Sequence, residues 1–181
     1  MGTQEASGLT TEHQVARLWA IHEIGQLVYR YAYAFDTRDF DEYRALWAET
    51  EEPTQLPVLD GHFCRSPAFL DAAAGLGPSF LFVGNHIIDF EDDDHARGRV
   101  YCLCQQDVAG EFSDQSILYR DRYVRQNGRW LFESREHLLF FGQPRDRNPY
   151  AQEPANWPQS AVGRGTLPDD FETYRRAKGL G

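Results

Sequence analysis

The hydrophobic period changes once along the chain, and this change restricts the fold more than any other feature of the sequence. Between residues 12 and 47, apolar residues recur every three or four positions, as they do in amphipathic helices. Four later segments are instead rich in Val, Ile, Phe, Tyr and Leu and are separated by turn residues: residues 79–90, 96–108, 115–124 and 130–141. Helices followed by consecutive strands predict an α+β fold, with N-terminal helices on one face of an antiparallel sheet. Because the strands are long, we expect a curved, cone-shaped sheet that encloses an apolar pocket.

Capping residues indicate where the helices begin and end. Thr11 has the spacing of a capping box with the glutamine three residues later, and the first helix should end near Asp36. Asp39 is a candidate cap for a shorter second helix, and Pro67 fits the first turn of a third helix that runs to about residue 74. Asp36 is therefore predicted to lie at a corner between two helices.

The length of 181 residues is enough for one globular domain with a substantial core. We place this domain at residues 12–142, after a flexible lead over residues 1–11. A C-terminal extension over residues 143–181 is rich in proline and polar residues and ends in a short helical patch at residues 169–178. The acidic segment at residues 91–94 and the Asn-Gly pair at residues 127–128 are predicted hairpin turns.

Composition excludes several classes of partner. The formal net charge of −10 repels phosphate backbones and anionic lipids, so neither nucleic acid nor a membrane surface is an expected partner. The first twenty residues lack the basic start and apolar run of a signal peptide, which predicts a cytoplasmic protein.

Cys64, Cys102 and Cys104 belong to no metal-ligand set and are expected as reduced, buried thiols, with no metal or organic cofactor. The 12 Phe, 9 Tyr and 4 Trp residues are a large supply for lining a core or a cavity.

Four segments in order resemble SnoaL-like proteins of the nuclear transport factor 2-like superfamily, which has scytalone dehydratase and ketosteroid isomerase types. They are residues 31–47 (YAYAFDTRDFDEYRALW), 84–89 (GNHIID) with 96–98 (ARG), 119–123 (YRDRY) and 127–130 (NGRW). The resemblance covers about residues 12–141 and implies the same α+β cone. Members of the family include dehydratases, dehydrochlorinases, isomerases, polyketide cyclases and carbon-carbon lyases, and a shared fold does not decide between these reactions.

The resemblance also implies a set of catalytic residues. The family's corner carboxylate matches Asp36, the polar residue five positions earlier matches Tyr31, and the arginine of the last strand matches Arg135. Leu81 occupies the position of the family's usual histidine, so the usual Asp-His relay is not expected here. His137 is the first substitute, since alternation along a strand puts it on the same face as Arg135.

Other residues are candidates for contact with the substrate. His86 has the opposite parity to Leu81 on its strand and is expected on the outer face, whereas Asn85 shares Leu81's face. The expected substrate-binding residues are Leu81, Asn85, Gln106, Tyr119 and Trp47.

Structural roles compete with these catalytic ones. Asp36 can be a helix cap, Tyr31 a core residue, and Arg135 the surface partner of Glu133 or Glu136.

The residues and the resemblance together favour a cofactor-independent lyase. It would abstract a proton from a small hydrophobic or aromatic, ring-containing substrate and promote dehydration or carbon-carbon cleavage. An isomerase or polyketide-type cyclase in the same pocket is the first alternative, and a non-catalytic ligand-binding or subunit protein is the second. We expect a homo-oligomer, either a dimer or a trimer, because a long sheet leaves one face open.

Overall fold

The computed structural model describes residues 10–49, 62–63 and 67–180. Its helices are α1 (Thr11–Thr37), α2 (Phe40–Ala45), α3 (Pro67–Gly75) and α4 (Glu172–Ala177), with a 3-10 turn η1 at Pro149–Ala151. Its strands are β1 (His62–Phe63), β2 (Ser79–Phe90), β3 (His95–Val108), β4 (Glu111–Gln126) and β5 (Arg129–Pro144). Within these described residues, no helix is long and apolar enough to cross a membrane.

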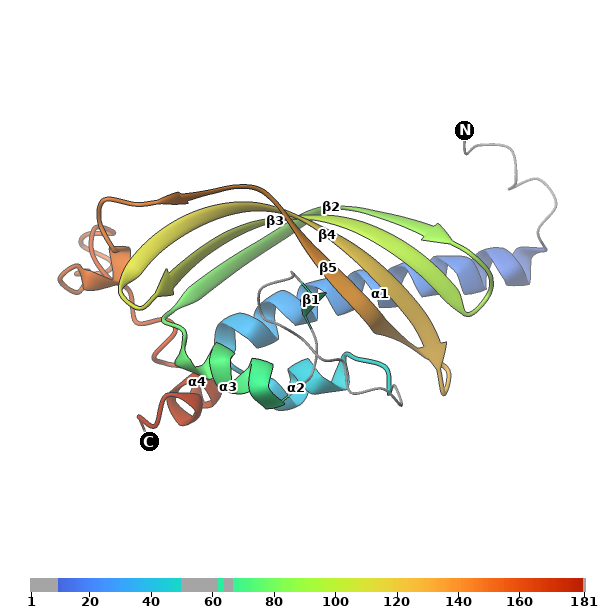
Figure 1. Ribbon diagram of the computed structural model, residues 1–181, viewed down its shortest axis with the longest axis horizontal. Helices are drawn as coiled ribbons and strands as arrows, with labels where there is room; N and C mark the ends of the chain where they lie inside the picture. Colours follow the sequence, from blue (N-terminus) through green and yellow to red (C-terminus); the bar gives the residue numbers. More distant parts are fainter. Residues whose placement is uncertain (1–9, 50–61, 64–66, 181) are drawn as a thin grey trace.

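The strands form one antiparallel sheet in the order β1-β5-β4-β3-β2. The four long strands follow one another through hairpins, and the predicted turns at residues 91–94 and 127–128 are two of them. Helix α1 runs along one side of this sheet, on the same side as α2 and α3 (Figure 1). The prediction of an α+β fold with N-terminal helices packed on an antiparallel sheet is confirmed.

Three register shifts interrupt the ladders of the long strands. One lies at Asn85 in β2, and the other two leave Glu133 and Phe140 of β5 without a partner in β4. A bulge bends its strand and moves the following side chains to the opposite face. Figure 1 draws β2 to β5 as bowed ribbons that arch over α1.

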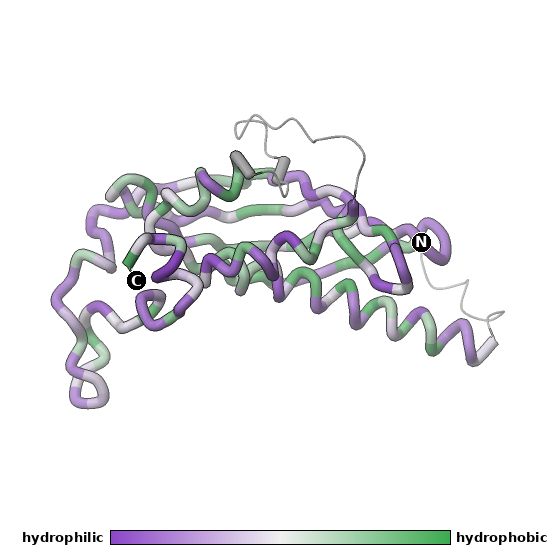
Figure 2. Tube along the Cα trace, turned by 90° about the horizontal axis from the view of Figure 1, so that it is seen from below, coloured by the Kyte–Doolittle hydropathy of each residue, from purple (hydrophilic) through white to green (hydrophobic). Residues whose placement is uncertain are grey.

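The inner face of the sheet and the inner stripe of α1 form the core. In β3 the buried side chains alternate strictly, and the predicted buried thiols Cys102 and Cys104 are among them, both free; Cys64 lies outside the described residues. Tyr31 of α1 lies at the centre of an aromatic cluster, with ring centroids 5.4–6.4 Å from those of five neighbours: Phe35, Tyr43, Trp47, Tyr119 and Phe132. Seen from below in Figure 2, hydrophobic and hydrophilic stretches alternate along α1, as an amphipathic helix requires.

Candidate functional site

The corner between α1 and α2 is built by local capping. Arg38 ends α1 in the left-handed conformation, with φ 56°, and the Asp39 side chain accepts a hydrogen bond from the Glu42 N–H to cap α2. At the other end of α1 the N-cap is Thr10, one residue before the predicted Thr11. Since Asp39 caps α2, Asp36 is free to point away from the helix ends.

The Asp36 carboxylate reaches across to β2. Oδ1 accepts a hydrogen bond from Ser79 Oγ at 2.8 Å, and Oδ2 accepts one from the Leu81 backbone N–H at 2.9 Å. Burial raises the pKa of Asp36 to about 6, against the opposing effects of these two hydrogen bonds and of Arg38. The carboxyl is therefore a half-buried acid that remains mostly ionised at neutral pH.

Arg38 supports Asp36 through Ser79. Its side chain is buried, and Nη1 donates to Ser79 Oγ at 3.0 Å, which in turn donates to Asp36. Nη2 donates to the Gly77 carbonyl at 2.7 Å, and Nη1 also donates to the Phe35 carbonyl. Arg38 thus fixes the end of α1 against the start of β2, which is where the carboxyl lies.

A second charged group lies on the inner face of the sheet. Arg135 of β5 is fully buried, and its Nε and Nη2 donate to the two oxygens of Asp121 of β4 at 2.7 and 2.6 Å. The guanidinium lies 4.1–4.5 Å from the ring centroids of Tyr31, Tyr119 and Phe132. Burial works against the charge of Arg135, but Asp121 more than offsets it and holds the arginine pKa above its usual value. Arg135 Nη1 has no hydrogen-bond partner among the described residues.

Asp121 extends this pair into a short polar chain. Tyr123 Oη donates to Asp121 Oδ2 at 2.6 Å and lies 3.1 Å from His86 Nε2. Burial lowers the pKa of His86, with Asp121 opposing, so the imidazole is neutral at neutral pH. The chain thus joins one imidazole to the Arg135 guanidinium through a phenol and a carboxylate.

The bulge in β2 overturns two expectations. Asn85 takes φ 30° and is exposed, so the prediction that it reaches into the interior is wrong. The bulge reverses the parity of the strand, which brings His86 to the inner face instead of the outer face. In the sequence, the Gly84-Asn85 pair is the signal that could have predicted this bulge, since asparagine tolerates a positive φ and glycine within a strand often accompanies a bulge.

The other candidate residues lie on or near the inner face. Tyr31 and Tyr119 are buried, which raises the pKa of Tyr31 to about 12 and that of Tyr119 well above its usual value. His137 pairs in register with Tyr119 and shares the inner face with Arg135; its ring centroid is 5.7 Å from that of Tyr119. Burial, followed by the Arg135 charge, lowers the pKa of His137.

Three further residues were expected to bind the substrate: Leu81, Trp47 and Gln106. Leu81 and Trp47 are buried, and Trp47 is held there because the residues on either side of it exchange backbone hydrogen bonds with Phe132. Gln106 is half-buried and lies opposite Ser79 in the ladder, the residue whose hydroxyl donates to Asp36. The alternative in which Arg135 pairs with Glu133 or Glu136 is excluded by its pairing with Asp121.

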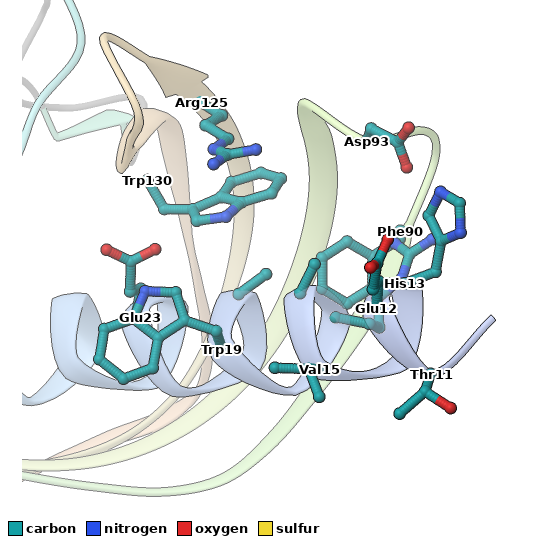
Figure 3. A pocket seen from close by; sticks show the side chains of 13 residues that line it. Thr11, Glu12, His13, Val15, Trp19, Glu23, Phe90, Asp93, Arg125 and Trp130 are labelled. Carbon is teal, nitrogen blue, oxygen red and sulfur yellow. The ribbon is translucent and has the colours of Figure 1, made fainter. Parts of the chain in front are cut away.

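A separate groove of about 630 Å³ lies between the first half of α1 and the hairpin tips. Figure 3 shows Trp19 and Glu23 on α1 facing Trp130 and Arg125 across it, and the Arg17 guanidinium lies 4.0 Å from the Phe90 ring. At about 1.5 Å per residue, Trp19 is about 25 Å from Asp36 along α1, so this groove does not include the carboxyl. Across the described part of the chain, no three His, Cys, Asp or Glu side chains are arranged to hold a metal ion.

Comparison with family models finds the SnoaL-like domain over residues 16–136. The chain belongs to this family. It is thus a SnoaL-like member of the nuclear transport factor 2-like superfamily, and the match ends before the C-terminal extension. None of the curated protein sequences compared with it matches.

Solved structures share the fold of this SnoaL-like protein at low sequence identity. A LinA-type hexachlorocyclohexane dehydrochlorinase of Novosphingobium barchaimii is 15% identical, with a TM-score of 0.62 over 75% of this chain and 96% of that one. A scytalone dehydratase-like protein of Novosphingobium aromaticivorans is 20% identical, with a TM-score of 0.60 over 75% and 93% of the two chains. An NTF2-like protein with a cystatin-like fold from N. aromaticivorans is 22% identical, with a TM-score of 0.55 over 71% and 87%.

Proposed function

We propose that this SnoaL-like protein is a cofactor-independent lyase that eliminates a leaving group from a small, apolar, ring-containing substrate. The observation that carries the proposal is the Asp36 carboxyl, which is held by two hydrogen bonds and has a pKa of about 6. A carboxylate with that pKa is ionised at neutral pH and is a stronger base than an exposed one. The two structural neighbours named for elimination reactions, a dehydrochlorinase and a dehydratase-like protein, support this class of chemistry.

In the proposed reaction, Asp36 takes a proton from a substrate carbon. The electrons of the broken C–H bond form a carbon-carbon double bond, and the leaving group departs with its bonding pair. Arg135 stabilises the negative charge that develops, because its Nη1 is a buried donor with no partner in the described residues. Tyr31 adds a phenol beside the guanidinium, whose Cζ is 4.2 Å from the tyrosine ring centroid.

Loss of a hydroxyl group needs a proton that loss of a halide does not. His137 is our candidate donor, since it shares the inner face with Arg135: its protonated form, which is the minor form at neutral pH because burial lowers its pKa, gives its proton to the departing hydroxide, which leaves as water. His86 is the second imidazole on this face and is the alternative donor, again through its minor protonated form. Leu81 contributes only its backbone N–H to Asp36, so no relay passes through that position.

The test uses the two compounds named by the structural neighbours. We would incubate the protein with hexachlorocyclohexane and with scytalone, and follow chloride release and the mass of the products. Asp36→Asn should reduce turnover by on the order of 10²-fold to 10⁴-fold, the usual cost of losing a general base. Asp39→Asn is the matched control, since asparagine caps a helix about as well as aspartate and Asp39 does not face the carboxyl site.

Three outcomes would contradict the proposal. Wild-type turnover in Asp36→Asn would show that Asp36 is not the base. A product of unchanged mass would favour the isomerase or cyclase alternative. Binding of either compound without turnover, and with unchanged affinity in Asp36→Asn, would favour the non-catalytic alternative.

A further inference from the structure

The inner face of the sheet holds a chain of hydrogen bonds that ends at His86. Arg135 Nε and Nη2 donate to the two oxygens of Asp121, and Tyr123 Oη donates to Asp121 Oδ2 at 2.6 Å. Tyr123 Oη also lies 3.1 Å from His86 Nε2. The proposed reaction gives Arg135 a role but gives none to Tyr123, although Tyr123 is the link between the carboxylate and the imidazole.

A glycine makes room for the Tyr123 phenol. Gly98 of β3 pairs in register with Asp121 of β4, and a Cβ atom at position 98 would lie 2.6 Å from both Cε2 and Oη of Tyr123. A larger residue at position 98 would therefore displace the phenol from its place beside Asp121. Tyr123 is 1% exposed, so its hydroxyl depends on its partners within the protein.

The donors and acceptors of this chain fix the position of each proton. Asp121 accepts from Arg135 through both of its oxygens, so it is a carboxylate and has no proton to offer Tyr123. A phenol has one proton, and Tyr123 uses it in the bond to Asp121. Tyr123 Oη can then only accept from His86, so Nε2 must carry the imidazole proton.

The other imidazole nitrogen is left open. His86 is half-buried, and its Nδ1 has no hydrogen-bond partner among the described residues. Nδ1 is not fully buried either, so water or a ligand can reach it. Burial lowers the pKa of His86, so the neutral form with a lone pair on Nδ1 is the main form at neutral pH. A proton that adds to this form must bind at Nδ1, because Nε2 already carries one.

We propose that Tyr123 is a positioning residue of His86, which keeps the imidazole proton on Nε2 and so makes Nδ1 the nitrogen from which His86 gives a proton. This inference rests on the proposed function, in which His86 is the alternative donor. In that step the Nδ1–H bond of the protonated imidazole breaks, its electrons stay on the nitrogen, and the proton joins the departing hydroxide to form water. Tyr123 keeps its own proton, because Arg135 holds Asp121 as a carboxylate.

The experiment reads the tautomer of His86 directly and needs no substrate. The full-length protein is labelled with ¹⁵N in its histidine rings, and two-bond correlation spectra at about pH 8 distinguish the Nε2–H form from the Nδ1–H form. The His86 signals are identified by their absence in His86→Gln. His86 should be in the Nε2–H form. His22, which is exposed and has no hydrogen bond among the described residues, should give the average of a mixture.

Tyr123→Phe removes the acceptor but keeps the ring. The ratio of the Nε2–H form to the Nδ1–H form should fall at least about 5-fold, the change expected from the loss of one hydrogen bond. Gly98→Ala should lower the ratio in the same direction, because the added methyl group displaces the phenol. Tyr29→Phe is the matched control, since Tyr29 is 53% exposed on α1 and takes no part in this chain of hydrogen bonds, and it should leave the ratio unchanged.

His86 in the Nδ1–H form in the wild-type protein would overturn the inference, since Tyr123 would then have no proton to accept. An unchanged ratio in folded Tyr123→Phe would also overturn it, and Gly98→Ala decides in the same way if Tyr123→Phe does not fold. These results are independent of turnover. If Asp36→Asn keeps wild-type turnover while His86 stays in the Nε2–H form, the lyase proposal fails and the role of Tyr123 in positioning His86 stands. If turnover depends on Asp36 but His86 is in the Nδ1–H form, the lyase stands and the role of Tyr123 does not.

Discussion

The buried pair between Asp121 and Arg135 offers the sharpest test of how the interior is held together. Both side chains have 0% exposure, and two hydrogen bonds of 2.6 and 2.7 Å join them. Asp121→Asn keeps the size of the side chain but removes its charge. Arg135 would remain a buried cation with only a neutral partner, because the rings of Tyr31, Tyr119 and Phe132 surround it instead of water.

The expected loss is large for a single amide substitution. Breaking a buried ion pair by removing one partner costs about 3–5 kcal/mol, since the remaining charge is left without compensation. At about 2–4 °C per kcal/mol for a chain of this size, the melting temperature should fall by about 6–20 °C. Urea unfolding followed by circular dichroism measures the free energy, and a thermal melt measures the temperature shift.

Asp89→Asn is the matched control for this change. Asp89 also pairs with an arginine at 2.8 Å, but Asp89 and Arg99 are 64% and 54% exposed, so the loss should be about 0.2–1 kcal/mol. The double variant Asp121→Leu with Arg135→Met should be more stable than Asp121→Asn alone, because it leaves no buried charge. Equal losses in Asp121→Asn and Asp89→Asn would refute the reasoning.

Three further predictions concern Asp36, the outer face of the sheet and metal ions. Since the folded pKa of Asp36 is raised to about 6 from an ordinary value of 3.8, its contribution to stability falls as pH rises from about 4 to about 6. Over this range Asp36→Asn should gain on the order of 2 kcal/mol relative to wild type in urea unfolding, whereas turnover in wild type should rise. We propose that the exposed outer residues Phe82, Leu103 and Phe140 form the interface of a homo-oligomer: light scattering should give a dimer or trimer, and Phe140→Glu should reduce the mass to that of a monomer. Dialysis against a chelator should leave turnover unchanged, and activity restored only by a divalent ion would contradict this.

Strand alternation and helix capping made much of this site predictable. The strand over residues 79–90 has the predicted bounds, and Arg135 and His137 share a face because no bulge separates them. Two missed residues follow from the same rule. Ser79 lies two positions before Leu81, and Asp121 lies two positions after Tyr119, so alternation alone places both on the inner face.

The remaining features depend on backbone conformations that the sequence marks weakly. His86 reaches the interior only because Asn85 adopts a positive φ within a strand. Arg38 occupies a left-handed helix end where glycine is the usual residue, and the hydrogen bonds of its guanidinium compensate for the strain. Neither the positive φ of Asn85 nor the hydrogen bonds of Arg38 leave a clear local pattern in the sequence. Sequence rules therefore place His86 on the wrong face and make no prediction for the Arg38 side chain.

The charges of the interior also restrict which substrate the proposed lyase would accept. Arg135 faces Asp121, Arg38 lies beside Asp36, and burial lowers the pKa of both His86 and His137, which keeps these imidazoles neutral at neutral pH. The formal charge of this group is therefore zero while Asp36 is ionised, so an anionic substrate beside it would lose its hydration without meeting an uncompensated cation. When Asp36 accepts a proton, the same group becomes net positive at the moment when negative charge develops on the substrate. In the lyase that we propose, this arrangement would favour a neutral substrate whose charge appears only during the reaction, and it would favour the transition state over the bound ground state.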